Sequence, residues 1–133
     1  MRVYLVRHAE AAPGEPDELR PLTPEGRETA RALARLFVEH GVTPDAILTS
    51  PLLRARQTGE ELGRAFGVEV EPDDRLAPGA TEEDLRQAVA SRGEVVVAIG
   101  HQPDCGQIAA ALGDGVEPTF PPGYCVRLDV SAD

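Results

Sequence analysis

Several residue types and sequence features are absent from this chain of 133 residues, and their absence limits the classes of protein to which it can belong. The chain has no lysine and no asparagine, so its basic side chains are arginine and histidine only. No apolar run reaches the roughly 18 residues that a transmembrane helix needs, so we expect no membrane span. The sequence enters an apolar strand at once, with no signal region before it. We therefore expect a cytoplasmic protein.

Cysteine is also scarce, with only Cys105 and Cys125 in the chain. Neither has a neighbour at the spacing of metal ligands, so we expect both thiols to be reduced and structural. The three histidines, His8, His40 and His101, are far apart in the sequence. We expect neither a metal nor a cofactor. The sequence does not decide whether Cys105 touches a functional pocket.

The net charge of −10 argues against nucleic acid or an anionic membrane as the partner. An acidic protein can still hold a small basic pocket, which would attract anions over the roughly 8–10 Å that salt screening allows. The length fits one domain, residues 1–133, with one continuous core.

The hydrophobic pattern predicts strands alternating with helices. Strands are expected at residues 3–6, 46–49, 68–70, 94–100 and 124–130. Helices are expected at 24–40, 51–66 and 81–92, with a short fourth helix that ends at 113. This alternation predicts an α/β fold, a three-layer α/β/α sandwich with a mostly parallel central sheet.

Two of the predicted helices begin with a hydroxyl residue followed by proline. Thr23-Pro24 and Ser50-Pro51 each place an N-cap before a proline suited to the first helical turn. The third helix begins with acidic residues that suit the helix dipole.

Basic side chains follow two of the predicted strands and begin one of the helices. Arg7 and His8 end the first strand, His101 ends the fourth, and Arg54 lies in the first turn of the second helix. The carboxyl ends of parallel strands lie at one edge of a sheet, where ligands bind. We therefore expect these four side chains to meet there.

Such a cluster is costly unless it binds an anion. Two unit charges 4 Å apart repel by about 4 kcal/mol at an effective dielectric of 20. Guanidinium forks and imidazoles suit the oxygens of a phosphoryl group. We expect an anion-sized pocket contacted by Arg7, Arg54 and His101, with neither guanidinium held in an ion pair away from His8.

Three segments resemble the signatures of the histidine phosphatase superfamily, which includes phosphoglycerate mutases and small phosphatases. They are Arg-His-Ala-Glu at 7–10, Ser-Pro-Leu-Leu-Arg-Ala-Arg-Gln-Thr at 50–58, and Gly-His at 100–101. Residues 20–26 also resemble the loop that opens the family's first helix. The resemblance covers residues 1 to about 112. It implies a phosphoglycerate mutase-like fold, and the short chain is similar to the SixA type of phosphohistidine phosphatase.

The resemblance implies a role for each basic group. His8 would be the nucleophile that becomes phosphorylated, while Arg7, Arg54 and His101 would bind the phosphoryl oxygens. Ala9 stands where the family usually has glycine, which is tolerable if the backbone needs no positive φ. The acid that protonates the leaving oxygen in many members has no clear counterpart, because Glu82 and Glu83 resemble first-turn helix acids.

We therefore expect a phosphatase that removes phosphate from phosphohistidine on a protein. A small-molecule phosphomonoesterase is an alternative, in which Glu10, Asp17, Glu82 or Glu83 would be the acid. A phosphate-ligand binding module without turnover is another, and mutase activity is the least expected. The partner would be a phosphorylated protein or a small phosphorylated substrate. The sequence does not indicate an oligomeric state.

Overall fold

The computed structural model describes residues 1–131, and within them strands and helices alternate as predicted. The strands are β1 (Arg2–Arg7), β2 (Ala46–Thr49), β3 (Val70–Pro72), β4 (Val95–Gly100) and β5 (Cys125–Asp129). The α-helices are α1 (Pro24–Glu39), α2 (Leu53–Phe66), α3 (Glu82–Val89) and α4 (Asp104–Leu112). Two short 3-10 helices, η1 (Asp17–Leu19) and η2 (Asp74–Leu76), precede α1 and α3.

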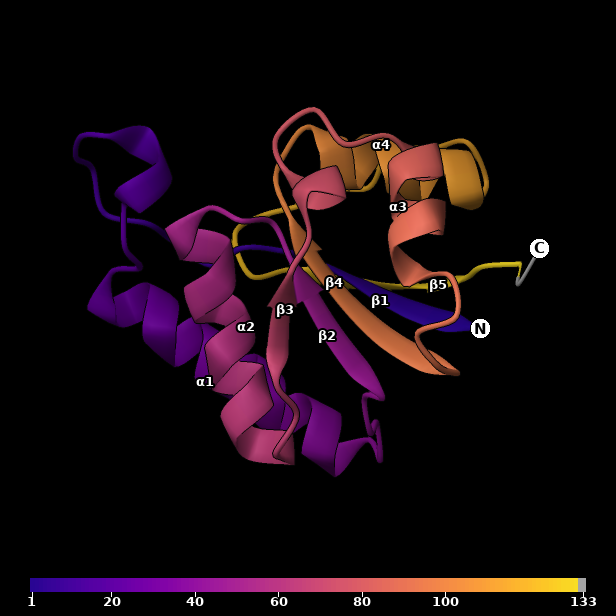
Figure 1. Ribbon diagram of the computed structural model, residues 1–133, viewed down its shortest axis with the longest axis horizontal. Coiled ribbons are helices and arrows are strands. Elements are labelled where there is room, and N and C mark those ends of the chain that lie inside the picture. The colour runs from indigo at the N-terminus through magenta and orange to yellow at the C-terminus, as the bar shows by residue number, and fades with distance from the viewer. Residues whose placement is uncertain (132–133) are drawn as a thin grey trace.

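The strands form one sheet in the order β3-β2-β4-β1-β5. All neighbouring pairs are parallel except β1 with β5, which is antiparallel and forms one edge. Helices α1 and α2 cover one face and α3 and α4 the other (Figure 1). The predicted three-layer sandwich with a mostly parallel sheet is therefore confirmed.

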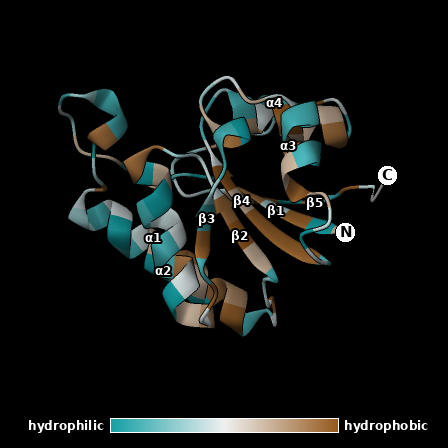
Figure 2. Ribbon diagram, in the orientation of Figure 1, coloured by the Kyte–Doolittle hydropathy of each residue, from teal (hydrophilic) through white to brown (hydrophobic). Residues whose placement is uncertain are grey.

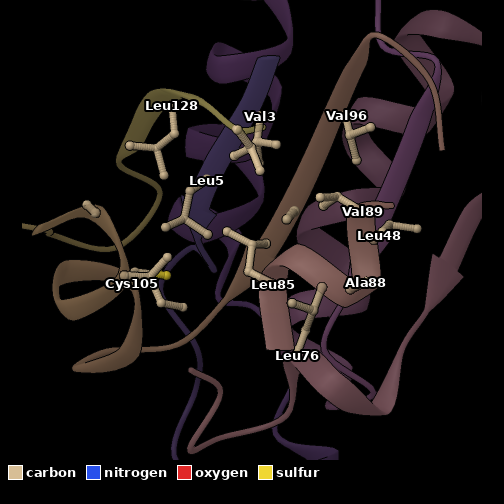
Figure 3. Close-up of a cluster of buried hydrophobic side chains, with 14 of the residues drawn as sticks. Val3, Leu5, Leu48, Leu76, Leu85, Ala88, Val89, Val96, Cys105 and Leu128 are labelled. Atoms are coloured by element: carbon tan, nitrogen blue, oxygen red, sulfur yellow. The ribbon is translucent and has the colours of Figure 1, made fainter. Parts of the chain in front are cut away.

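Strand β4 lies at the centre, and all six of its residues are buried. Its side chains alternate between two apolar clusters, because successive residues of a strand point to opposite faces. Val96 belongs to the cluster under α3 and α4, together with Leu85 and Cys105 (Figure 3). Val97 and Ile99 belong to the cluster under α1 and α2. In Figure 2 the strands are coloured mainly hydrophobic, while the helices carry hydrophilic residues on their outer sides.

Some element boundaries differ from the prediction. Helix α2 begins at Leu53 rather than 51, and its N-cap is Leu52. The predicted cap by Ser50 is therefore wrong, and its hydroxyl lies 2.8 Å from His101 Nε2 instead. Strand β3 begins at Val70 rather than 68, because the N–H of Val68 still donates to a carbonyl of α2. Helix α3 ends at Val89 rather than 92, because Ala90 has a ψ angle of 130°, which is not helical.

Other helix ends match their sequence signals. The Thr23 side chain accepts a hydrogen bond from the Gly26 N–H and caps α1, as predicted. Thr81 and Asp84 cap α3 reciprocally. Within residues 1–131, none of the helices combines the length and the apolar character needed to cross a membrane.

Candidate active site

The two histidines that follow β1 and β4 lie against each other. The strands are parallel neighbours in which Arg7 pairs with Gly100, and the His8 N–H donates to the Gly100 carbonyl at 3.0 Å. The His8 and His101 rings are 5.1 Å apart at their centroids, edge to face. Parallel pairing therefore brings together side chains that are far apart in the sequence.

The His8 ring has a defined tautomer. Its Nδ1 lies 2.7 Å from the main-chain oxygen of Ala9. A carbonyl oxygen can only accept, so Nδ1 carries the proton and Nε2 keeps its lone pair. Burial lowers the pKa of His8 to about 4, and the charges of Arg54 and Arg7 act in the same direction against the Ala9 hydrogen bond. The ring is therefore a neutral imidazole at pH 7, the form that attacks as a nucleophile.

His101 is neutral for similar reasons. Burial, together with the neighbouring His8 and Arg54, lowers its pKa to about 4. Its Nε2 lies 2.8 Å from the Ser50 hydroxyl, and this pair is buried. Sequence reasoning assigned Ser50 to a helix cap and missed this contact, which joins the end of β2 to the end of β4.

Arg7 has one anchored nitrogen and one unpaired nitrogen. Its Nη1 donates to the Phe120 carbonyl at 3.0 Å. Its Nε is buried and finds no hydrogen-bond partner within residues 1–131. A buried donor without a partner costs about 1–3 kcal/mol, so the structure carries a local cost at this arginine.

Arg54 forms an ion pair with Asp17, whereas the expectation was that neither guanidinium would be ion-paired away from His8. Its Nη1 donates to the Asp17 main-chain oxygen at 2.9 Å, and its Nη2 to Asp17 Oδ2 at 3.2 Å. Its charge nevertheless lowers the pKa of His8 and of His101, so it remains within their electrostatic reach. With several cations gathered at this edge, a carboxylate partner reduces their mutual repulsion.

Thr58 connects the loop after His8 to α2. It is the last residue of the motif at 50–58, but the sequence did not indicate a role for it. Its hydroxyl is fully buried, accepts from the Ala9 N–H at 3.1 Å and donates to the Arg54 carbonyl at 2.8 Å. Ala9 itself is buried and has no positive φ, so alanine is tolerated there as expected. The local sequence around Thr58 could not have revealed the bond to Ala9, because the two residues are 49 positions apart in the chain.

The four candidate acids are all engaged elsewhere or ionised. Glu82 and Glu83 lie in the first turn of α3, as predicted, and their carboxylates contact side chains one turn later. Glu10 accepts a hydrogen bond from the Thr23 hydroxyl at 2.9 Å. Hydrogen bonds from two arginines hold the pKa of Asp17 below its usual range, so it carries no proton to donate at pH 7.

Cys105 is part of the core. It is buried, and burial raises the pKa of its thiol to about 12. A thiol held in this protonated state is a poor nucleophile. Cys105 and Cys125 are both free. Within the described part of the chain, no three His, Cys, Asp or Glu side chains are grouped as metal ligands would be.

Comparison with known proteins agrees with this geometry. Residues 3–103 match the profile of the Histidine phosphatase superfamily (branch 1). Phosphohistidine phosphatase SixA of Escherichia coli strain K12 is 35% identical over 128 residues, which are 89% of this chain and 78% of that protein.

Solved structures agree in fold. The protein histidine phosphatase SixA complexed with tungstate superposes with a TM-score of 0.89 at 30% identity, covering 99% of this chain and 90% of that chain. The crystal structure of the candidate phosphohistidine phosphatase SixA from Agrobacterium tumefaciens superposes with a TM-score of 0.80 at 34% identity, covering 96% of this chain and 90% of that chain. With a match over most of its length and relatives above 30% identity, this chain belongs to the histidine phosphatase superfamily.

Proposed function

We propose that this protein is a phosphohistidine phosphatase that acts on phosphorylated histidine in other proteins through a phosphohistidine intermediate at His8. The observation that carries the proposal is the unprotonated Nε2 of His8, next to His101 and within reach of two guanidinium groups. Relatives named as phosphohistidine phosphatases support the choice of substrate. We place this activity in the cytoplasm, and the net charge of −10 favours a protein substrate over nucleic acid.

In the first step, His8 Nε2 forms a bond to phosphorus while the bond from phosphorus to the substrate nitrogen breaks. The bonding electron pair stays with the leaving imidazole. Arg7, Arg54 and His101 would donate hydrogen bonds to the phosphoryl oxygens. Positioning and electrostatic stabilisation supply most of the catalysis in phosphoryl transfer.

In the second step, water attacks phosphorus from the side that the substrate imidazole has left. The oxygen of water bonds to phosphorus, the bond to His8 Nε2 breaks, and its electron pair returns to the ring. The proton lost by water passes to the phosphate product or to solvent. Inorganic phosphate leaves and His8 regains its starting state, with Nδ1 still donating to Ala9.

The lack of a positioned proton donor favours this substrate class. An alkoxide leaving group needs general acid catalysis, which contributes about 10²–10⁴-fold. An imidazole is a far weaker base and needs it much less. Because Asp17 is ionised and Glu10, Glu82 and Glu83 have other partners, a phosphorylated nitrogen is the better substrate for this site.

The test compares kcat/KM for a phosphohistidine protein and for an alkyl phosphate ester. We expect a preference for phosphohistidine of at least about 100-fold, the low end of the missing acid contribution. The variant His8→Ala should lose turnover, and His40→Ala, a change at an exposed histidine at the end of α1, should retain it. A preference for the ester would identify a phosphomonoesterase, and phosphate binding without turnover would identify a binding module.

A further inference from the structure

Asp17 links two arginines at the edge of the site. Its Oδ1 accepts from Arg20 Nη1 at 2.9 Å, and its Oδ2 accepts from Arg54 Nη2 at 3.2 Å. Its main-chain oxygen also accepts from Arg54 Nη1. Two hydrogen bonds to the carboxylate and one to the main chain therefore fix the position of Asp17, although it belongs to η1 in a loop that projects beside the start of α2 (Figure 1).

The carboxylate lies on the solvent side of Arg54. The Arg54 side chain is 9% exposed, whereas that of Asp17 is 59% exposed. The charges of Arg54 and Arg20 both act on His8, and the charge of Asp17 acts on His101. The leaving group of a bound substrate must extend toward solvent, and we place Asp17 on that side because it is the exposed partner of Arg54 and its charge reaches His101.

Asp17 supplies a fixed negative charge there and not a proton. Its hydrogen bonds from Arg20 and Arg54 hold its pKa below the usual range, so it stays ionised at neutral pH. Near an anion site such a charge has two effects. It attracts a cationic group on the substrate, and it repels a second anionic group.

We propose that Asp17 determines which phosphorylated group the site accepts, favouring a phosphorylated imidazole and excluding substrates with a second phosphate. A phosphorylated imidazole reacts with a proton on its other ring nitrogen. The ring is then a cation until the bond from phosphorus to nitrogen breaks, when the electron pair stays with nitrogen and a neutral imidazole leaves. The carboxylate stabilises that protonated, reactive form. The inference rests on the function proposed above and adds the residue that selects the substrate.

The variant Asp17→Asn tests this selection, because it removes the charge and keeps both the side-chain size and the main-chain acceptor for Arg54. We expect the ratio of kcat/KM for a phosphohistidine peptide to that for p-nitrophenyl phosphate to fall by roughly 3- to 10-fold, a modest effect because the group is solvent-screened. Inhibition of p-nitrophenyl phosphate hydrolysis by inorganic pyrophosphate should strengthen by a similar factor.

The control is Glu18→Gln, which makes the same change in net charge one residue away. Glu18 is exposed and lies in the same turn, and within residues 1–131 it forms no hydrogen bond or ion pair with Arg20 or Arg54. We therefore expect neither the kcat/KM ratio nor the pyrophosphate inhibition to change. If Asp17→Asn weakens pyrophosphate inhibition and slows both substrates equally, Asp17 only orders Arg54 and the proposal is wrong. An unchanged ratio and unchanged inhibition also overturn it. If the wild-type protein hydrolyses p-nitrophenyl phosphate but not phosphohistidine, the proposed function is wrong. The measurement of pyrophosphate inhibition would still test whether Asp17 repels a second phosphate group.

Discussion

Replacing Thr58 by valine should uncouple the His8 loop from α2. The Thr58 hydroxyl is fully buried and accepts from the Ala9 N–H at 3.1 Å while it donates to the Arg54 carbonyl at 2.8 Å. Valine has nearly the same shape, so the Thr58→Val variant fills the space and removes only the hydroxyl. The Ala9 N–H then stays buried without its partner, which costs about 1–3 kcal/mol of unfolding free energy.

The same change should lower activity. Ala9 follows His8 directly, and its carbonyl orients the His8 ring through the bond of 2.7 Å to Nδ1. A displacement of about 1 Å at a reacting group can cost about 100-fold in rate, so we expect kcat/KM to fall by roughly 10- to 100-fold. Urea unfolding measures the stability, and hydrolysis of p-nitrophenyl phosphate measures the activity.

The matched control is Thr58→Ser, which keeps the hydroxyl and removes one methyl group. Its expected cost is about 1 kcal/mol of stability, with activity near that of the wild type. Equal loss of activity in both variants would mean that packing of the methyl group matters and the hydroxyl does not. Full activity and full stability in Thr58→Val would refute the coupling itself.

Three further predictions concern the pH dependence of activity, the pH dependence of stability, and the packing of α1 against the main chain of Glu10. Because the pKa of His8 is about 4, kcat/KM for p-nitrophenyl phosphate, whose leaving group needs no proton, should lose no activity through His8 between pH 8 and about 5 and should fall near pH 4. A loss of activity centred near pH 6.5 with this substrate would contradict this pKa. Because the folded-state pKa values of His8 and His101 lie below the unfolded value of 6.5, the unfolded chain binds more protons between pH 6.5 and 4. The unfolding free energy should therefore fall as the pH falls through this window, by at most about 3 kcal/mol per histidine, and His101→Gln should reduce that dependence. The variant Gly26→Ala would place a Cβ against the main-chain oxygen of Glu10, so we expect its unfolding free energy in urea to be lower by about 1–3 kcal/mol. A variant as stable as the wild type would show that the main chain at Glu10 can move aside without cost.

The meeting of His8 and His101 could be predicted because each follows an uninterrupted apolar strand. Such strands are buried on both faces in a parallel sheet, and parallel neighbours end at the same edge. The roles of Ser50 and Thr58 could not be predicted in the same way. Their partners, His101 and Ala9, lie about 50 residues away, and a local pattern carries no information on such contacts.

The ion pair of Asp17 with Arg54 also escaped prediction, for a different reason. Residues 11–21 form a loop rich in proline, glycine and acids, so no periodicity indicates which side chain turns inward. Several acids of this loop could have partnered an arginine. The fold decides, because η1 contacts the start of α2 and brings Asp17 to the guanidinium of Arg54.

The central claim is that the phosphoryl group passes through His8, and trapping the phosphorylated protein tests it most directly. The protein is mixed with a radiolabelled phosphohistidine protein, quenched in alkali within the first turnover, and mapped by peptide mass spectrometry. We predict acid-labile, alkali-stable phosphate on His8, and none in His8→Ala. Turnover of the substrate without any phosphorylation of the enzyme, or label on an enzyme residue other than His8, would contradict the role of His8.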